Sequence, residues 1–183
     1  MKFFFLIALG NVVLLPVHAE LDDSKPYLNA YLWIQEAQQL ENVQKDYLGA
    51  MIRYKWAGIS LQHFREVDPN WQVDLLISRI KLCQDSVKAL EPKATAQILA
   101  QFHPDSSFDV AIPYFDAAQE AQRANDHYGT LVAFDECRTA LTVIHRAYPK
   151  WHPEETSERI ALCEQKIGSN KFAQQWQLHK SAQ

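Results

Sequence analysis

Residues 69–83 read Pro-Asn-Trp-Gln-Val-Asp-Leu-Leu-Ile-Ser-Arg-Ile-Lys-Leu-Cys, and residues 149–163 read Pro-Lys-Trp-His-Pro-Glu-Glu-Thr-Ser-Glu-Arg-Ile-Ala-Leu-Cys. Both stretches contain Pro-x-Trp, then seven residues, then Arg-Ile-x-Leu-Cys. They lie 80 positions apart, and the same offset gives nine identities in 43 positions between residues 46–88 and 126–168. Self-similarity at a fixed spacing is typical of proteins built from repeated units. The sequence therefore predicts an internal duplication.

Each copy reads as three helices. The first begins at Pro26 or at Pro113, since proline is favoured in the first turn of a helix. The second covers roughly residues 44–67 and 126–147, where apolar residues recur at spacings of three and four. Pro69 and Pro149 end the second helices, and the third helices follow Trp71 and Trp151. With few glycines and no sustained alternation of apolar and polar residues, the sequence predicts an all-α fold.

The predicted organisation is two similar three-helix units, stacked as a short helical array. It divides the chain into a signal peptide (1–19), a first unit (20–90), a connector with one short helix (91–112), a second unit (113–168) and a C-terminal capping helix or tail (169–183). A capping element is expected because the last unit of a repeat stack needs cover for its exposed end.

The first 19 residues have the pattern of a secretory signal. Lys2 precedes an apolar run, and Val17-His18-Ala19 places small residues at the usual cleavage positions. No other run is long and apolar enough to span a membrane. We therefore expect an exported chain, periplasmic or extracellular, without a membrane span after cleavage, in surroundings that oxidise cysteines.

The second helix of each unit resembles a tetratricopeptide repeat, a family of paired antiparallel helices. The aromatic–small series of that family is matched by Tyr47, Ala50, Tyr54 and Ala57, and in the second unit by His127, Thr130, Phe134 and Cys137. The third helix of each unit is an addition to the family's pattern. The resemblance implies a non-catalytic scaffold for a protein or peptide partner, bound in a groove lined by the first helices. It makes Tyr27, Tyr31 and Trp33 the candidate partner contacts.

The shared motif supplies further candidates: Pro69, Trp71, Arg79, Cys83, Pro149, Trp151, Arg159 and Cys163. We expect the two tryptophans to fill the turn between the second and third helices, because tryptophan contributes mainly through burial. The alternative is a binding role. Each arginine is expected to lay its stem over the core and to bond the carbonyls that end a neighbouring helix, or to stack on the tryptophan. The alternative is recognition of an anion or a carboxylate.

Three cysteines are spaced so that two of them can meet. Cys137 lies 12 residues before Pro149 and Cys163 lies 12 residues after Trp151, so both stand at the same height on facing helices. In an oxidising compartment this placement permits a Cys137–Cys163 disulfide, and the alternative is three buried thiols. The equivalent pair in the first unit is Ala57 and Cys83, which leaves Cys83 without a partner.

Composition and motifs argue against several classes of function. The net charge is −4 and no basic block is present, which argues against nucleic-acid binding. No His-Glu-x-x-His, Cys-x-x-Cys, phosphate loop or nucleophile elbow occurs, so we expect no enzyme, no metal site and no cofactor. The alternative to a scaffold is a helical bundle that binds a small ligand or a metal between its helices. An enzyme with an unrecognised site is the third option.

Overall fold

The computed structural model describes residues 26–170, which fold into six α-helices and two short helical turns without any strand. The elements are α1 (Pro26–Gln39), η1 (Leu40–Gln44), α2 (Tyr47–Val67), α3 (Val73–Gln101), η2 (Pro104–Val110), α4 (Ile112–Arg123), α5 (His127–Ala147) and α6 (Pro153–Gly168). The predicted all-α class is thus confirmed. The predicted signal peptide and nearly all of the predicted capping segment lie outside the described residues.

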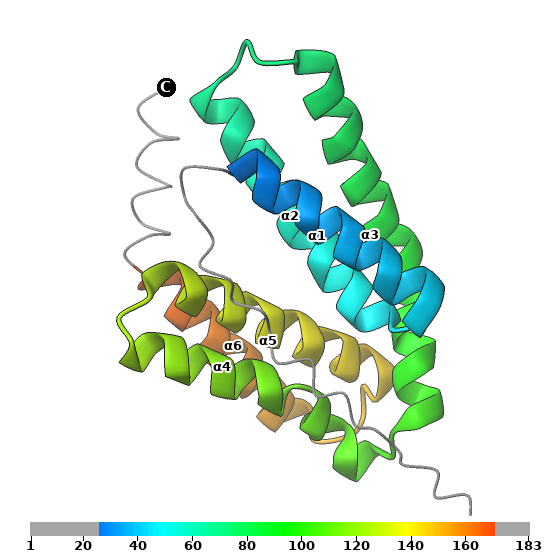
Figure 1. The fold of residues 1–183 in the computed structure, drawn as a ribbon. Helices are drawn as coiled ribbons and strands as arrows, with labels where there is room; N and C mark the ends of the chain where they lie inside the picture. The colour runs from blue at the N-terminus through cyan, green and yellow to red at the C-terminus, as the bar shows by residue number, and fades with distance from the viewer. Residues whose placement is uncertain (1–25, 171–183) are drawn as a thin grey trace, which may run out of the picture.

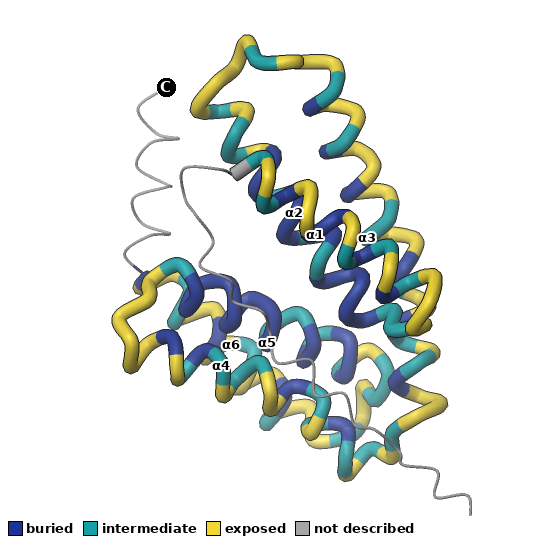
Figure 2. The backbone as a smooth tube through the Cα atoms, viewed as in Figure 1, coloured by how far each residue is buried: buried dark blue, intermediate teal, exposed yellow. Residues whose placement is uncertain are grey.

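The helices gather in two groups of three (Figure 1). In the first group α2 packs against both α1 and α3, and in the second α5 packs against both α4 and α6. The buried residues accordingly concentrate on α2 and α5, while the outer helices each keep an exposed face (Figure 2). Because each central helix is covered on two sides, it carries a wider apolar surface than a helix with one buried stripe.

Several local conformations recur 80 positions apart. Asp46 and Asp126 cap α2 and α5 by accepting a hydrogen bond from the backbone N–H of Gly49 (3.0 Å) and Gly129 (2.8 Å). A left-handed backbone occurs at Lys45 and Asn125 before these helices, and at Gln72 and His152 before α3 and α6. The same signals therefore begin the second and third helices in both groups.

Helix α3 differs from the predicted boundaries. The expected end before Pro92, with a separate short helix after it, is wrong: α3 runs unbroken to Gln101 with Pro92 inside it. Pro92 is exposed, so water can hydrogen-bond the carbonyl that loses its N–H partner. Ala94 and Ile98 are buried, and the packing of this extension outweighs the local cost of the proline.

The extension of α3 joins the two groups. It packs against α5, where Glu91 forms an ion pair with Arg146. Just past its end, the Tyr148 hydroxyl donates a hydrogen bond to the carbonyl of Phe102. Near the other end of α5, the Trp56 ring of α2 meets Tyr128 edge to face. The junction is therefore made by packed side chains from both groups.

Candidate functional site

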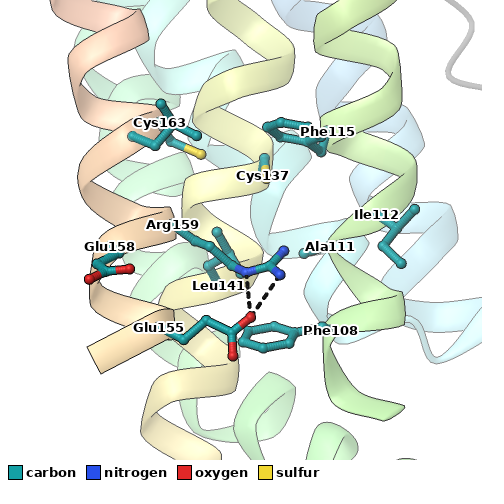
Figure 3. A pocket seen from close by; sticks show the side chains of 11 residues that line it. Phe108, Ala111, Ile112, Phe115, Cys137, Leu141, Glu155, Glu158, Arg159 and Cys163 are labelled. Atoms are coloured by element: carbon teal, nitrogen blue, oxygen red, sulfur yellow. Dashed lines mark hydrogen bonds and ion pairs between the residues drawn. The ribbon is translucent and has the colours of Figure 1, made fainter. Parts of the chain in front are cut away.

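A cavity of about 430 Å³ opens between η2, α4, α5 and α6. Its lining is mostly aromatic and aliphatic, with three charged side chains and two thiols: Phe108, Ala111, Ile112, Phe115, Cys137, Leu141, Glu155, Glu158, Arg159, Leu162 and Cys163 (Figure 3). We refer to it below as the α4–α6 pocket. Its size falls in the range of pockets that hold small molecules or single anchoring side chains.

The η2 turn forms one wall of the pocket. Its Phe108 ring packs against Trp151, with ring centroids 4.8 Å apart. The indole N–H of Trp151 donates to Asp105 in the same turn at 3.1 Å. Trp151 therefore holds η2 against the start of α6, and it is half-buried rather than enclosed.

Arg159 stands beside this wall and makes two kinds of contact. Its guanidinium lies 4.6 Å from the centre of the Phe108 ring, and it donates to Glu155 from Nε at 3.2 Å and from Nη2 at 2.8 Å (Figure 3). Both partners of the ion pair are about half exposed, so the pair itself adds little stability. The expected partners, the tryptophan ring or helix-end carbonyls, are wrong: Arg159 lies over Phe108, which the repeat pattern does not include, and donates to Glu155.

Cys137 and Cys163 come together in the pocket from facing helices α5 and α6. Both are free and buried in this structure. Interaction with the Cys163 thiol, together with burial, raises the pKa of Cys137, and interaction with Cys137 lowers the pKa of Cys163 despite its burial. The structure thus brings together the predicted pair of cysteines, and the disulfide between them stays a prediction.

The rim of the pocket is partly apolar and partly acidic. Ile112 is 47% exposed and Leu162 is 39% exposed, which extends the apolar lining onto the surface. Glu158 lies on the outer side of α6 and forms no ion pair with any described residue (Figure 3). With Glu155 and Arg159, the rim carries two negative charges and one positive charge.

The three predicted partner contacts on α1 have different environments. Trp33 is 7% exposed and packs edge to face on Trp56, so it is a core residue and its assignment as a partner contact is corrected. Tyr27 is half-buried between Trp71 and Phe64. Tyr31 is exposed, and the Arg79 guanidinium lies 5.5 Å from its ring centre. Of the three, Tyr31 has the most accessible side chain, and it lies outside the α4–α6 pocket.

The motif residues of the first unit serve packing. Trp71 follows Pro69 in the turn and packs on Phe64 with ring centroids 5.1 Å apart, but it is half-buried, less than expected. Cys83 is buried in the contact between α2 and α3, and burial raises the pKa of its thiol to about 11. Pro149 is exposed in the turn before Trp151.

The sequence pattern missed a cluster of charged residues between the two groups of helices. Arg53 of α2 pairs with Glu36 of α1 (Nε to Oε2, 3.1 Å) and with Glu136 of α5, whose side chain is fully buried. Lys55 pairs with Asp135 at 2.6 Å. These residues lie between the apolar positions of the second helices, so the apolar spacing gave no signal of their burial.

In this cluster, burial disfavours the charged form of each ionisable side chain. Burial raises the pKa of Glu136 despite the nearby Arg53, and burial lowers the pKa of Lys55 despite the nearby Asp135. For Arg53, burial acts to lower the pKa, but the carboxylates of Glu136 and Glu36 outweigh it and the pKa is raised. The cluster joins the two groups of helices through ion pairs between α2 and α5. Of its members, Lys55 also lines a second open cavity, of about 300 Å³, beside Cys83.

Residues 26–170 contain neither a metal-binding cluster of side chains nor a helix suited to crossing a membrane. No three His, Cys, Asp or Glu side chains of this part gather in a way that would hold a metal ion. None of its helices has both the length and the apolar character that crossing a membrane requires.

Comparisons with protein-family models, curated proteins and solved structures give no match to this chain. Its function is therefore argued from the chemistry of the site, because a fold alone does not determine function.

Proposed function

We propose that this chain is an exported, non-catalytic helical scaffold that binds a peptide segment of a protein partner in the α4–α6 pocket. The observation that carries the proposal is the open apolar cavity of about 430 Å³, bordered by the exposed side chains of Ile112 and Leu162. Protein interfaces draw most of their affinity from a few bulky side chains that fill such pockets. The duplicated unit, with its resemblance to tetratricopeptide repeats, supports the scaffold role.

The lining indicates which side chain of the partner enters. Phe108, Phe115 and Leu141 offer ring faces and methyl groups, and the charged groups of the lining stand on α6. An aromatic or branched aliphatic side chain would bury its apolar area there, at about 25 cal/mol per Å². We therefore propose a bulky apolar anchor.

The charge of the rim indicates what flanks the anchor. Glu155 and Glu158 outnumber Arg159, and the whole chain has a net charge of −4. A lysine or arginine beside the anchor residue of the partner would find complementary charge. The proposed ligand is thus a short segment with one bulky apolar residue and an adjacent basic residue.

The test is a selection of displayed random peptides on the chain without residues 1–19, followed by fluorescence anisotropy with the recovered peptides. We expect the recovered peptides to share an apolar anchor beside a basic residue. Leu162→Glu and Ile112→Glu place a charge on the apolar rim and should weaken binding about tenfold or more. Leu99→Glu is the matched control, because Leu99 is 52% exposed on α3 and does not line the pocket.

The proposal fails if the recovered peptides bind all three glutamate variants and the parent equally well. It fails also if no peptide with an apolar anchor is recovered while the chain remains folded by circular dichroism.

The second candidate is a small apolar ligand in the same pocket. The cavity volume favours it, because about 430 Å³ lies within the range of small-molecule sites. The neutral fluorophore 1-aminoanthracene separates the two functions. Binding of this probe that no selected peptide displaces would favour the small ligand, and displacement by a peptide would favour the scaffold.

A further inference from the structure

We propose that Cys137 and Cys163 form a reversible dithiol–disulfide site that opens into the α4–α6 pocket, and that the disulfide form holds apolar ligands more weakly than the dithiol form. The first part stands on the geometry of the two cysteines. The second part, control of binding, rests on the proposed function of the pocket.

The geometry begins with two thiols on facing helices. Cys137 of α5 and Cys163 of α6 are both free, stand on two helices that pack on each other, and line the same pocket (Figure 3). Each thiol also shifts the pKa of the other, as neighbouring groups do. A disulfide requires the two sulfurs to be about 2.05 Å apart and the two Cβ atoms to be about 3.5–4.5 Å apart. The bond can therefore form by a short approach of side chains that already meet.

The pocket supplies a path to these thiols. Each cysteine is at most 2% exposed, yet both line the α4–α6 pocket (Figure 3). A small neutral disulfide can enter an apolar cavity of this size, whereas a large or charged oxidant is disfavoured. The chemical class of the oxidant is therefore a low-molecular-weight disulfide.

The surroundings favour Cys163 as the attacking sulfur. Its interaction with Cys137 lowers the pKa of the Cys163 thiol and outweighs burial, which raises it. Arg138 acts in the same direction as Cys137, and the smaller effects of Asp135 and Glu164 oppose it. Cys83 is the natural comparison within the chain. It is equally buried, its thiol is held in the protonated form, and Ala57 stands where a partner cysteine would be.

The reaction takes two exchange steps. The Cys163 thiolate attacks one sulfur of the small disulfide R–S–S–R, the S–S bond breaks, and one RS⁻ leaves with the proton that Cys163 gave up. Cys137 then attacks the sulfur of Cys163, and the second RS⁻ leaves with the proton from Cys137. Two protein thiols are oxidised to one disulfide, and one R–S–S–R is reduced to two RSH.

The bond changes the pocket because its sulfurs belong to the lining. Bringing them from non-bonded contact to bonding distance draws α5 and α6 together beside Phe115 and Leu141. The cavity then narrows. An apolar group that fits the dithiol form therefore loses contact area or meets steric overlap in the disulfide form.

The first experiment counts thiols in the chain without residues 1–19 after incubation with bis(2-hydroxyethyl) disulfide and removal of the reagent. We expect one free thiol under denaturing conditions in the parent, and three again after dithiothreitol. Cys83→Ser should fall from two free thiols to none without gaining mass from a retained R–S group. Cys137→Ser should instead keep one R–S group on Cys163.

The second experiment titrates 1-aminoanthracene into the reduced and the oxidised parent. We expect affinity to fall about tenfold on oxidation and to return on reduction, with the same behaviour in Cys83→Ser. In Cys163→Ser, which cannot form the bond, the oxidant should leave probe affinity unchanged. If Cys163→Ser does not fold, Cys163→Ala replaces it in this titration, with the same expected result.

Three free thiols in the treated parent overturn the dithiol–disulfide site, and equal probe affinities in the two forms overturn the control of binding. The two proposals fail separately. A reduced parent that binds neither the probe nor any selected peptide removes the pocket function and its control, whereas the thiol count still decides the redox site.

Discussion

Glu136 is a charged residue in the core: its side chain is fully buried and faces Arg53 across the junction of α5 and α2. Removing one member of a buried ion pair leaves the other charge uncompensated, at a cost of about 3–5 kcal/mol. We therefore expect Arg53→Met to lower the free energy of unfolding by about that amount, measured by urea denaturation. Lys93→Met is the control, because the Lys93–Glu41 pair is partly exposed and should contribute at most about 1 kcal/mol.

An Arg53→Met variant as stable as the parent would mean that Glu136 loses its charge or reaches solvent without difficulty, and the cluster would then not join the two groups of helices.

The raised pKa of Glu136 predicts that the free energy of unfolding depends on pH. Burial raises the folded-state pKa of Glu136 above its ordinary value of 4.5. The contribution of such a group to stability is fully present below the ordinary pKa and is lost as pH rises through the raised one. Gln cannot ionise, so Glu136→Gln should gain stability relative to the parent as the pH rises above 4.5, the ordinary pKa of the carboxyl.

Urea denaturation of both proteins across this range is the measurement. A difference between parent and variant that does not change with pH would contradict the raised pKa.

At the scale of elements, the start of α2 and of α5 depends on an aspartate and a glycine three residues later. A Cβ built on Gly49 or Gly129 would lie 2.3 or 2.2 Å from the capping carboxylate, so glycine leaves room for the cap. Asp46→Ala and Asp126→Ala should each cost about 1 kcal/mol in thermal or urea unfolding. Asp85→Ala is the control, an exposed position inside α3. If all three substitutions lower stability by the same amount, the capping role of Asp46 and Asp126 is contradicted.

The turn between α2 and α3 makes a second prediction at this scale. Trp71 packs on Tyr27 and Phe64 but is half-buried. Trp71→Ala should therefore cost about 2–3 kcal/mol, less than the loss of a fully enclosed ring. Trp71→Phe keeps an aromatic contact and should recover most of the loss. Unchanged unfolding with impaired peptide binding would instead make Trp71 a contact residue.

Helix boundaries were predictable where a side chain signals them locally. Pro69 and Pro149 follow the ends of α2 and α5 as expected, because a proline acts through its own backbone neighbours. Asp126 caps α5 at the predicted start, whereas α2 begins at Tyr47, after its cap Asp46 and later than the predicted start near residue 44. Pro92 misled the prediction because tertiary packing of Ala94 and Ile98 against the rest of the chain decides whether that helix continues. A local signal cannot report such packing.

At the scale of the whole molecule, residues 80 positions apart have different roles where the two groups of helices meet. Lys55 and Asp135 lie 80 positions apart, and they pair directly with each other. Trp56 and Glu136 are likewise 80 positions apart, and one is an aromatic core residue while the other is a buried ion. At the junction between the two groups of helices, residues 80 positions apart therefore carry different charges.

The sequence predicted only part of the candidate site, because the repeat pattern covers some of the residues that line the pocket and not others. The pairing of Cys137 with Cys163 followed from their equal distances to the turn. Phe108, which completes the pocket, belongs to η2, and no repeat pattern covers that turn. Its contact with Trp151 and Arg159 arises from the path of the chain after α3, which only the fold reveals.

The most direct test of the α4–α6 pocket as the partner site is the hydrogen-exchange footprint of a selected peptide on the chain. We predict that protection on binding concentrates in residues 108–115 and 155–163, the η2–α4 and α6 walls of the pocket. Residues 27–35 of α1, which include the exposed Tyr31, should exchange as in the free chain. Protection over residues 27–35 without protection around the pocket would contradict the proposed site.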